Sequence, residues 1–321
     1  MLYACMKIIV RIAMKIFCRE IIVSNRAMLK KEGPLLLASN HPNSFLDAVI
    51  LDILFQEPIW SLTRGDVFKN KFISRILTTL KMFPVYRVSE GVENLNSNYE
   101  TFENCKNIFI KKGIVLIFSE GRCINEWHLR PLKKGTARLA ISSWVEDIPL
   151  HVLPVGINYS SFRRFGKNII INFGEIITKN DIQWNEAEGI RFQSFNNKLR
   201  KQLTTLVFEI DKEDKKGKQD LFKKKTSVIL KMFLAIPAFT GWLIHLPLYL
   251  PVQKIVYKKT AHNDHFDSVL AAALLFTYPF YLLLISFLTF YFTKSSISFL
   301  LLFVMPFTAW CYVQVKGQLD K

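Results

Sequence analysis

Cysteine is scarce in this chain, and its five cysteines show no spacing typical of a bonded pair or a zinc site. They lie far apart and form no CxxC motif: Cys5, Cys18, Cys105, Cys123 and Cys311. An odd and scattered set argues against a disulfide framework, and it favours reduced thiols in a protein that faces the cytosol. Repeats and low-complexity tracts are also missing, and 321 residues suffice for one large domain with an appendage or for two domains.

Acidic residues are in short supply as well, with 26 Asp and Glu against 43 Lys and Arg and a formal net charge of +17. Such a charge indicates an anionic partner, which is a membrane phospholipid, a phosphorylated substrate or a nucleic acid. The chain carries no RNA- or DNA-binding motif, and half of its residues are hydrophobic, with 27 Phe. Lipid and phosphorylated substrates are therefore favoured, and no nucleic-acid partner is expected.

The first 19 residues lack a small-residue cleavage site, and four cations interrupt their apolar sequence, which disfavours a signal peptide. Lys7, Arg11, Lys15 and Arg19 recur at every fourth position, so they form one stripe along a helix. The pattern predicts an amphipathic helix over residues 1–19 that lies in the membrane interface, with its cations toward lipid phosphates. A basic-edged helix packed on the protein core is the alternative.

A charged linker over residues 211–227 precedes a sharp change of composition, and residues 228–321 are predicted to be membrane-associated. The stretch 268–292 has no charged residue and exceeds the about 20 residues needed to cross a bilayer. The stretch 296–315 is a second candidate. Because only a short turn with Lys294 separates them, the two predict a transmembrane hairpin whose outer ends lie on one side of the membrane.

Residues 228–250 are also apolar, but they contain Lys231 and His245, and prolines interrupt or end the run. If this segment crossed the membrane, the lysines that follow it would face away from the basic domain, against the positive-inside tendency. An interfacial or re-entrant segment is therefore expected.

The cluster from His262 to Asp267 has the side chains of a metal site, yet no further cluster completes it. A polar turn with an Asp N-cap is expected there, and no metal site.

Between these two ends, residues 20–210 alternate short apolar runs with helical segments. Such alternation is typical of an α/β domain whose mostly parallel sheet is flanked by helices. Extended segments are predicted over 20–23, 35–38, 59–63, 83–87, 114–118, 150–157 and 168–173. Helices are predicted over 45–55, 71–81, 94–112, 136–144 and, closing the domain, within 181–210.

One polar loop follows the apolar run Leu35–Leu37 and contains His41, with Asp47 near the start of the next apolar run. Imidazole can accept a proton near neutral pH, and a carboxylate can orient the ring and stabilise its protonated form. Residues six apart do not share a helix face, so the two meet only if the chain turns after His41 and a helix begins near Ser44. The pair is predicted to be a base and its orienting acid, and ordinary hydrogen-bonding loop residues are the alternative.

Three further polar stretches follow predicted strands, which is where open α/β sheets place their sites. Glycine in such a loop lets a backbone N–H approach an anion, and an arginine offers a fork that suits phosphate. The N-terminus of a helix favours anions, and lysines just before it add positive charge there. The stretches are 63–68 with 84–87, 118–122 with 130–137, and 153–156.

The order of these blocks resembles that of the glycerolipid acyltransferase family, the enzymes that acylate glycerol 3-phosphate or lysophosphatidic acid. The family's NHxSxxD block appears here in the longer form NHPNSFLD, which is similar to the fungal glycerol 3-phosphate and dihydroxyacetone phosphate acyltransferases. Its GxxF block is matched by Gly65 and Phe68, followed by Arg87. Its FPEGTRS block appears as Phe118–Cys123, with serine in place of proline and Arg122 one place early.

This resemblance covers about residues 20–210 and implies that His41 is the general base for the acceptor hydroxyl, with Asp47 holding the ring. It implies an acyl-CoA or acyl-carrier-protein donor, a phosphorylated glycerol acceptor and no cofactor. It also implies a membrane enzyme at anionic lipid, with its catalytic domain facing the cytoplasm. The implied substrate-binding residues are Arg64, Gly65, Phe68, Arg87, Glu120, Gly121, Arg122 and Pro154. Another lyso-lipid as acceptor, or a catalytically idle basic membrane-binding protein, are the alternatives.

Overall fold

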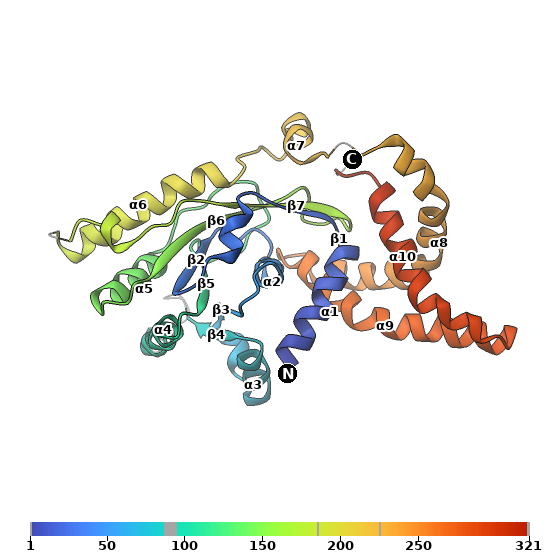
Figure 1. Ribbon diagram of the computed structural model, residues 1–321, viewed down its shortest axis with the longest axis horizontal. Helices are drawn as coiled ribbons and strands as arrows, with labels where there is room; N and C mark the ends of the chain where they lie inside the picture. The colour runs from blue at the N-terminus through green and yellow to red at the C-terminus, as the bar shows by residue number, and fades with distance from the viewer. Residues whose placement is uncertain (1, 87–94, 185, 225, 320–321) are drawn as a thin grey trace. The chain divides into compact units, whose positions relative to one another are not determined.

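A seven-stranded sheet organises the fold in the computed structural model, which describes residues 2–86, 95–184, 186–224 and 226–319 (Figure 1). The strand order is β1-β7-β6-β2-β5-β3-β4. Strand β2 pairs in parallel with β5 and β6, and β3 pairs in parallel with β4 and β5. The predicted α/β fold with a mostly parallel sheet is therefore confirmed. The strands are β1 (Cys18–Val23), β2 (Leu35–Ser39), β3 (Ile59–Arg64), β4 (Met82–Val85), β5 (Ile114–Phe118), β6 (His151–Tyr159) and β7 (Lys167–Phe173).

Helices flank this sheet and continue beyond it toward the C-terminus (Figure 1). In the part of the chain that the structure describes they are α1 (Leu2–Phe17), α2 (Phe45–Leu54), α3 (Lys71–Thr79), α4 (Leu95–Ile110), α5 (Lys134–Val145), α6 (Glu188–Leu206), α7 (Lys215–Phe222), α8 (Val228–Lys259), α9 (Phe266–Thr293) and α10 (Leu301–Val315). Residues of α5 and α6, including Trp144 and Phe195, share one buried core with residues of β2 and β5. This core covers the sheet and fixes its carboxyl edge.

Strand β2 lies at the middle of the sheet, and its composition follows from that position. Leu35, Leu36 and Leu37 are fully buried, because parallel neighbours flank the strand and side chains cover both of its faces. Parallel strands place their carboxyl ends at one edge of a sheet. The loops that follow β2, β3 and β5 therefore leave from the same edge, and the loop with His41 is one of them.

The chain divides into two compact units that do not follow the linear boundaries expected from the sequence. Unit 1 comprises Met1–Ile8, Val23–Asn158 and Ile170–Lys212, and unit 2 comprises Ile9–Ile22, Tyr159–Ile169 and Glu213–Lys321. Helix α1 and the β6–β7 region thus contribute to both units. The stretch 211–227, expected as a charged linker, contains α7, whose Phe222 is buried.

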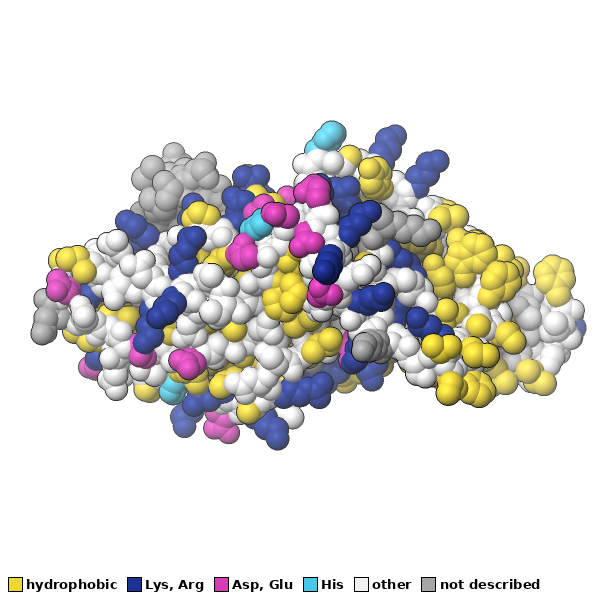
Figure 2. Space-filling model, turned by 90° about the horizontal axis from the view of Figure 1, so that it is seen from above, with side chains coloured by type: hydrophobic (Ala, Val, Ile, Leu, Met, Phe, Trp, Pro, Cys, Tyr) yellow, Lys and Arg dark blue, Asp and Glu magenta, His cyan; other side chains and the backbone are white. Residues whose placement is uncertain are grey.

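Three helical stretches of unit 2 are long and apolar enough to cross a membrane: Val228–Lys259, Phe266–Thr293 and Ser296–Val315. The second and third match the positions of the expected hairpin, with Lys294 in the turn between them. In the first, α8 continues through its prolines to Lys259, so the prolines do not end the helix as the sequence suggested. Hydrophobic side chains cover much of these C-terminal helices in Figure 2.

Helices α8 and α10 pack closely against each other. A Cβ atom at Gly241 would lie 2.2 Å from the carbonyl oxygen of Thr308, so only glycine allows this approach. Ala238, one turn before Gly241, and Leu234, about two turns before it, are buried in one cluster with Cys311. Small side chains on α8 therefore set the spacing between these helices.

A polar junction, defined here as the β6–β7 turn (159–169) with the ends of the unit 2 helices, joins the start of α8 to the end of α10. Asn168 Nδ2 donates to the carbonyl oxygen of Phe222 at 2.8 Å and to Gln318 Oε1 at 2.9 Å. Gln318 in turn bonds both main-chain groups of Lys224, at 2.7 and 2.6 Å. The residues just before α8 therefore lie beside the residues just after α10.

The far end of α8 reaches the same polar junction. The guanidinium of Arg163 lies 6.0 Å from the ring centroid of Tyr257, and the rings of Phe165 and Tyr249 are 5.6 Å apart. A straight helix of 32 residues would be about 48 Å long. The β6–β7 region thus contacts Phe222 ahead of α8 as well as Tyr249 and Tyr257 in its last third, and the three internal prolines of α8 permit a bend between these contacts.

The start of α9 is tied to the junction by a buried ion pair between Lys167 Nζ and Asp267 Oδ2, both with side chains 0% exposed. The N-cap of α9 is His265, without a side-chain capping bond, so the predicted Asp N-cap is wrong. Asp267 lies inside the first turn, and its carboxylate is engaged by Lys167. Within the described residues, no group of three or more His, Cys, Asp or Glu side chains is placed to hold a metal ion.

Candidate active site

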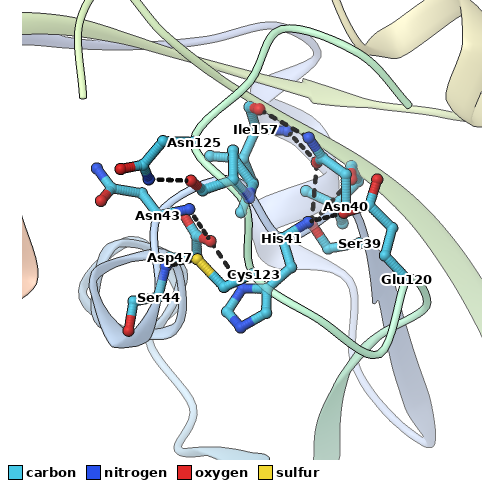
Figure 3. A network of polar contacts seen from close by, with 12 residues as sticks. Ser39, Asn40, His41, Asn43, Ser44, Asp47, Glu120, Cys123, Asn125 and Ile157 are labelled. Carbon is cyan, nitrogen blue, oxygen red and sulfur yellow. Dashed lines mark hydrogen bonds and ion pairs between the residues drawn. The ribbon is translucent and has the colours of Figure 1, made fainter. Parts of the chain in front are cut away.

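His41 and Asp47 meet at the carboxyl end of β2 (Figure 3). His41 Nδ1 lies 2.8 Å from Asp47 Oδ2, with the aspartate side chain fully buried and the histidine side chain 17% exposed. The chain turns between them because α2 begins at Phe45, which places Asp47 in its first turn. The structure therefore brings together the two residues that the sequence could join only through a turn.

The turn itself is held by backbone groups that bond to the same carboxylate. The backbone N–H of Asn43 donates to Asp47 Oδ2 at 2.8 Å, while Ser44, the N-cap of α2, makes no side-chain capping bond. Ser44 has a φ of 56°, a strained conformation for a residue with a side chain, and such strain is common at functional loops. A carboxylate accepts only, so Nδ1 of His41 donates to Asp47 and leaves Nε2 as the acceptor.

Glu120 fixes the backbone on both sides of the site. Its side chain is buried, with Oε2 accepting from the His41 N–H at 2.8 Å and Oε1 accepting from the Arg130 N–H at 2.9 Å. Burial raises the pKa of this carboxyl, and the two backbone donors oppose that rise. Glu120 therefore orders the loop that carries His41, and its contact with an acceptor stays a prediction.

The segment after β5 encloses the histidine loop. The ring of Phe118 stacks on the ring of His41, with centroids 3.8 Å apart and an interplanar angle of 11°. Asn125 Nδ2 donates to the carbonyl oxygen of Pro42 at 2.7 Å, and Ser44 N donates to Cys123 Sγ at 2.9 Å. These contacts were not expected from the sequence; only Phe118, the last residue of a strand before a polar motif, carried a signal.

Two side chains at the end of β2 extend its attachment to β6. Asn40 Nδ2 donates to the carbonyl oxygen of Ile157 at 3.0 Å, and the Ile157 N–H donates back to Asn40 Oδ1 at 2.8 Å. Ser39 Oγ donates to the carbonyl oxygen of Val155 at 3.0 Å. The residue before His41 is thus anchored in two directions, which limits the movement of the imidazole.

The first of the expected binding stretches lies in a 3₁₀ turn, Gly65–Phe68, directly after β3. Arg64 Nε and Nη2 bond the carboxylate of Asp66 at 3.1 and 2.6 Å, so this guanidinium fork is already engaged. Gly65 is buried, and a Cβ there would lie 2.1 Å from the Tyr86 ring, which explains the need for glycine. Phe68 is half-buried in the same turn.

The remaining expected binding residues are placed differently. Gly121 has a φ of +67° and lies against Lys133, and Arg122 beside it is exposed. Pro154 is buried within β6, so it contributes to the sheet under the site. Arg87 lies outside the described residues. A cationic loop therefore flanks the histidine, and substrate binding by these side chains stays a prediction.

Comparison with known proteins is consistent with this geometry. Residues 20–158 match the family model described as Acyltransferase. The chain is 26% identical over 139 residues to glycerol-3-phosphate O-acyltransferase 2 of Saccharomyces cerevisiae, and the match covers 43% of this chain and 18% of the yeast protein. The match therefore spans less than a fifth of that relative.

Among solved structures, the chain is similar to the 1-acyl-sn-glycerophosphate (LPA) acyltransferase of Thermotoga maritima. The TM-score is 0.42 with 12% sequence identity, over 63% of this chain and 78% of that one.

Proposed function

Residues 20–158 match the Acyltransferase family model, and from that premise we propose that this chain is a glycerolipid acyltransferase, which transfers a fatty acyl group from a thioester to a hydroxyl of a phosphorylated glycerol. The observation that carries the proposal is the 2.8 Å contact between His41 Nδ1 and the buried carboxylate of Asp47. A buried carboxylate with an enclosed imidazole suits general base catalysis on an alcohol. The name of the yeast relative makes glycerol 3-phosphate the first acceptor to test.

In the proposed reaction, His41 Nε2 accepts the proton of the acceptor hydroxyl while the hydroxyl oxygen attacks the thioester carbonyl carbon. The new C–O bond forms and the C–S bond breaks. The departing sulfur then takes the proton from His41, which releases the thiol of CoA or of acyl-carrier protein. Asp47 stabilises the imidazolium between these two transfers, and the balance requires neither a covalent acyl-enzyme nor a cofactor.

The acceptor phosphate is proposed to bind on the loop that follows β5. Arg122 is exposed there, Gly121 turns the chain with a φ of +67°, and Lys133 lies just before the start of α5. A helix N-terminus with adjacent cations favours a phosphate. Arg87 is proposed to complete this site, while Arg64 contributes less because Asp66 already engages it.

A direct assay tests the proposal. Purified full-length chain in detergent micelles would be incubated with acyl-CoA or acyl-carrier protein and, in turn, glycerol 3-phosphate, dihydroxyacetone phosphate, lysophosphatidic acid and other lyso-lipids. Thiol release and the acylated product would be followed by absorbance and by mass spectrometry. We expect an ester product with a phosphorylated glycerol, and the absence of any ester product with every acceptor would contradict the proposal.

Glu120→Gln is expected to lower kcat by about 10- to 100-fold while changing the acceptor KM less than about threefold. An amide offers one accepting oxygen, so the N–H of His41 or of Arg130 loses its partner and the imidazole loses its fixed position. Steady-state kinetics would separate the two parameters. Glu126→Gln, which removes only the negative charge from the side-chain contact to Arg130, is the matched control. A raised KM with an unchanged kcat would show instead that Glu120 contacts the acceptor.

For the membrane, α9 and α10 are proposed to cross as a hairpin, while α8 enters and returns on the cytoplasmic side. The polar junction supports this arrangement, because the β6–β7 region contacts Phe222, ahead of α8, and Tyr257, near the end of α8. Lys224 precedes α8, and Lys258 and Lys259 end it, so cations flank the helix at both ends. The exposed isoleucines of α1 are proposed to lie in the same membrane interface.

Cysteine labelling in sealed vesicles tests this topology. With a membrane-impermeant maleimide, Ser227→Cys and Lys259→Cys are expected to react from the same side and Ser296→Cys from the opposite side. Mass spectrometry of the labelled peptides would separate these sites from the native cysteines. Labelling of positions 227 and 259 from opposite sides would show that α8 crosses the bilayer.

A further inference from the structure

Helix α3 of unit 1 exposes an apolar face that no described residue of unit 1 covers. Its residues Phe72, Ile73 and Ile76 follow the spacing of one helix side and are 72%, 45% and 36% exposed. None of the nine residues of α3 is buried. A helix that only completed the core would turn this side inward, so the exposed side is available for an external partner.

The position of α3 connects this face to the catalytic edge of the sheet. Strand β3 runs parallel to β5, which runs parallel to β2, so β2 and β3 end at the same edge. His41 follows β2 there, and the turn Gly65–Phe68 leads from β3 into α3 (Figure 1). Val67 in that turn is 43% exposed and extends the apolar surface toward the edge.

The charge around α3 selects the kind of partner. Lys69, Lys71 and Arg75 are exposed, and the sequence has no acidic residue between Asp66 and Glu90. Asp66 is itself paired with Arg64. Long cationic side chains beside exposed Phe and Ile are the pattern of a helix that lies in the interface of an anionic bilayer.

We propose that α3 is a docking helix of the catalytic unit for an anionic phospholipid surface. Its apolar face inserts among the acyl chains, and its cations bind lipid phosphates. Docking places the carboxyl edge of the sheet, with His41, against the bilayer into which an acylated product would pass. A lipid surface is favoured over an acidic protein because the same chain carries bilayer-length helices, which keep unit 1 at a membrane.

Photo-crosslinking of the full chain tests this docking without relying on acyl transfer. Phe72 would be replaced by p-benzoylphenylalanine, and the protein would be placed in nanodiscs of phosphatidylcholine with phosphatidylglycerol and irradiated. Thr78, exposed on the polar side of the same helix, is the matched control position. We expect lipid adducts, counted by mass spectrometry, to be at least about fivefold more abundant from position 72 than from position 78.

A charge variant provides the second measurement. The triple change Lys69→Glu, Lys71→Glu and Arg75→Glu is expected to reduce the lipid adducts from position 72 to the level found in pure phosphatidylcholine nanodiscs. Equal labelling from positions 72 and 78 would overturn the proposal. A crosslink from position 72 to another copy of the chain, or to added acyl-carrier protein in preference to lipid, would also overturn it. Acyl transfer in detergent is measured separately, so failure of docking and failure of the proposed reaction are distinguishable.

Discussion

His41→Ala is expected to lower kcat for acyl transfer by about 10²- to 10⁴-fold, the usual contribution of a positioned general base. The substitution removes the group that accepts the hydroxyl proton, while Asp47 keeps its bond from the Asn43 N–H. The loop backbone is held separately by Glu120 through the His41 N–H, a contact that alanine retains. Thiol release from acyl-CoA measures the loss, and circular dichroism shows whether the fold persists.

A second histidine in unit 1 provides a matched control for this experiment. His128 also contacts a carboxylate at 2.8 Å, that of Glu209, but both side chains are 46% exposed. His128→Ala is expected to leave kcat within about twofold, because an exposed pair contributes little.

Asp47→Asn is expected to reduce kcat as well, since the amide no longer fixes the proton on Nδ1. Full activity in the folded His41→Ala protein would refute the assigned base.

Asp267→Ala is expected to destabilise unit 2 by about 3–5 kcal/mol, because it removes the carboxylate that the buried ammonium of Lys167 contacts. Both side chains are 0% exposed, so water cannot replace the lost carboxylate without opening the structure. The effect would be measured as the midpoint shift of thermal or denaturant unfolding of the full chain in detergent. This loss is large relative to the usual net stability of a domain, about 5–15 kcal/mol.

An exposed ion pair of unit 2 serves as the control for this prediction. Lys224 contacts Glu20, with side chains 53% and 34% exposed, and Glu20→Ala removes the same charge. That change is expected to cost less than about 1 kcal/mol. Replacing the buried pair together, Lys167→Met with Asp267→Leu, is expected to recover most of the stability lost in the single variant. Equal effects of Asp267→Ala and Glu20→Ala would contradict this account.

Local sequence pattern predicted the elements of the sheet domain well, because each has a clear periodicity. The run Leu35–Leu37 is apolar throughout, as a strand buried on both faces must be, and the structure has β2 there. The stretch 45–55 has helical spacing and became α2. The meeting of His41 with Asp47 could be predicted for the same reason, since it depends only on a strand, a turn and a helix start.

Contacts between residues distant in sequence could not be predicted. Glu120 was recognised as a motif residue, but its bonds to the His41 and Arg130 backbones depend on the pairing of β2 with β5. The Asp N-cap expected before α9 was wrong: His265 is the N-cap, and Asp267 lies inside the first turn, where Lys167 of β7 contacts its carboxylate. A pattern of neighbouring residues cannot predict an ion pair between side chains that are 100 residues apart in the sequence.

The prolines of α8 illustrate a different limit. Proline removes one backbone hydrogen bond and is expected to break a helix, yet α8 continues through Pro237, Pro247 and Pro251. Packing of Gly241 against Thr308 on α10 holds part of the helix in place, which propensity cannot register. The interfacial or re-entrant segment expected over residues 228–250 stays a prediction.

The interleaved composition of unit 2 has a consequence for biosynthesis. The strand residue Lys167 leaves the ribosome 100 residues ahead of the carboxylate that neutralises it. Until Asp267 has been synthesised, the ammonium of Lys167, which is buried in the folded protein, must stay in contact with water or with a chaperone. Termination between Lys212 and Asp267 would therefore release a nascent chain that contains all of unit 1 but lacks the carboxylate that Lys167 contacts in the folded protein.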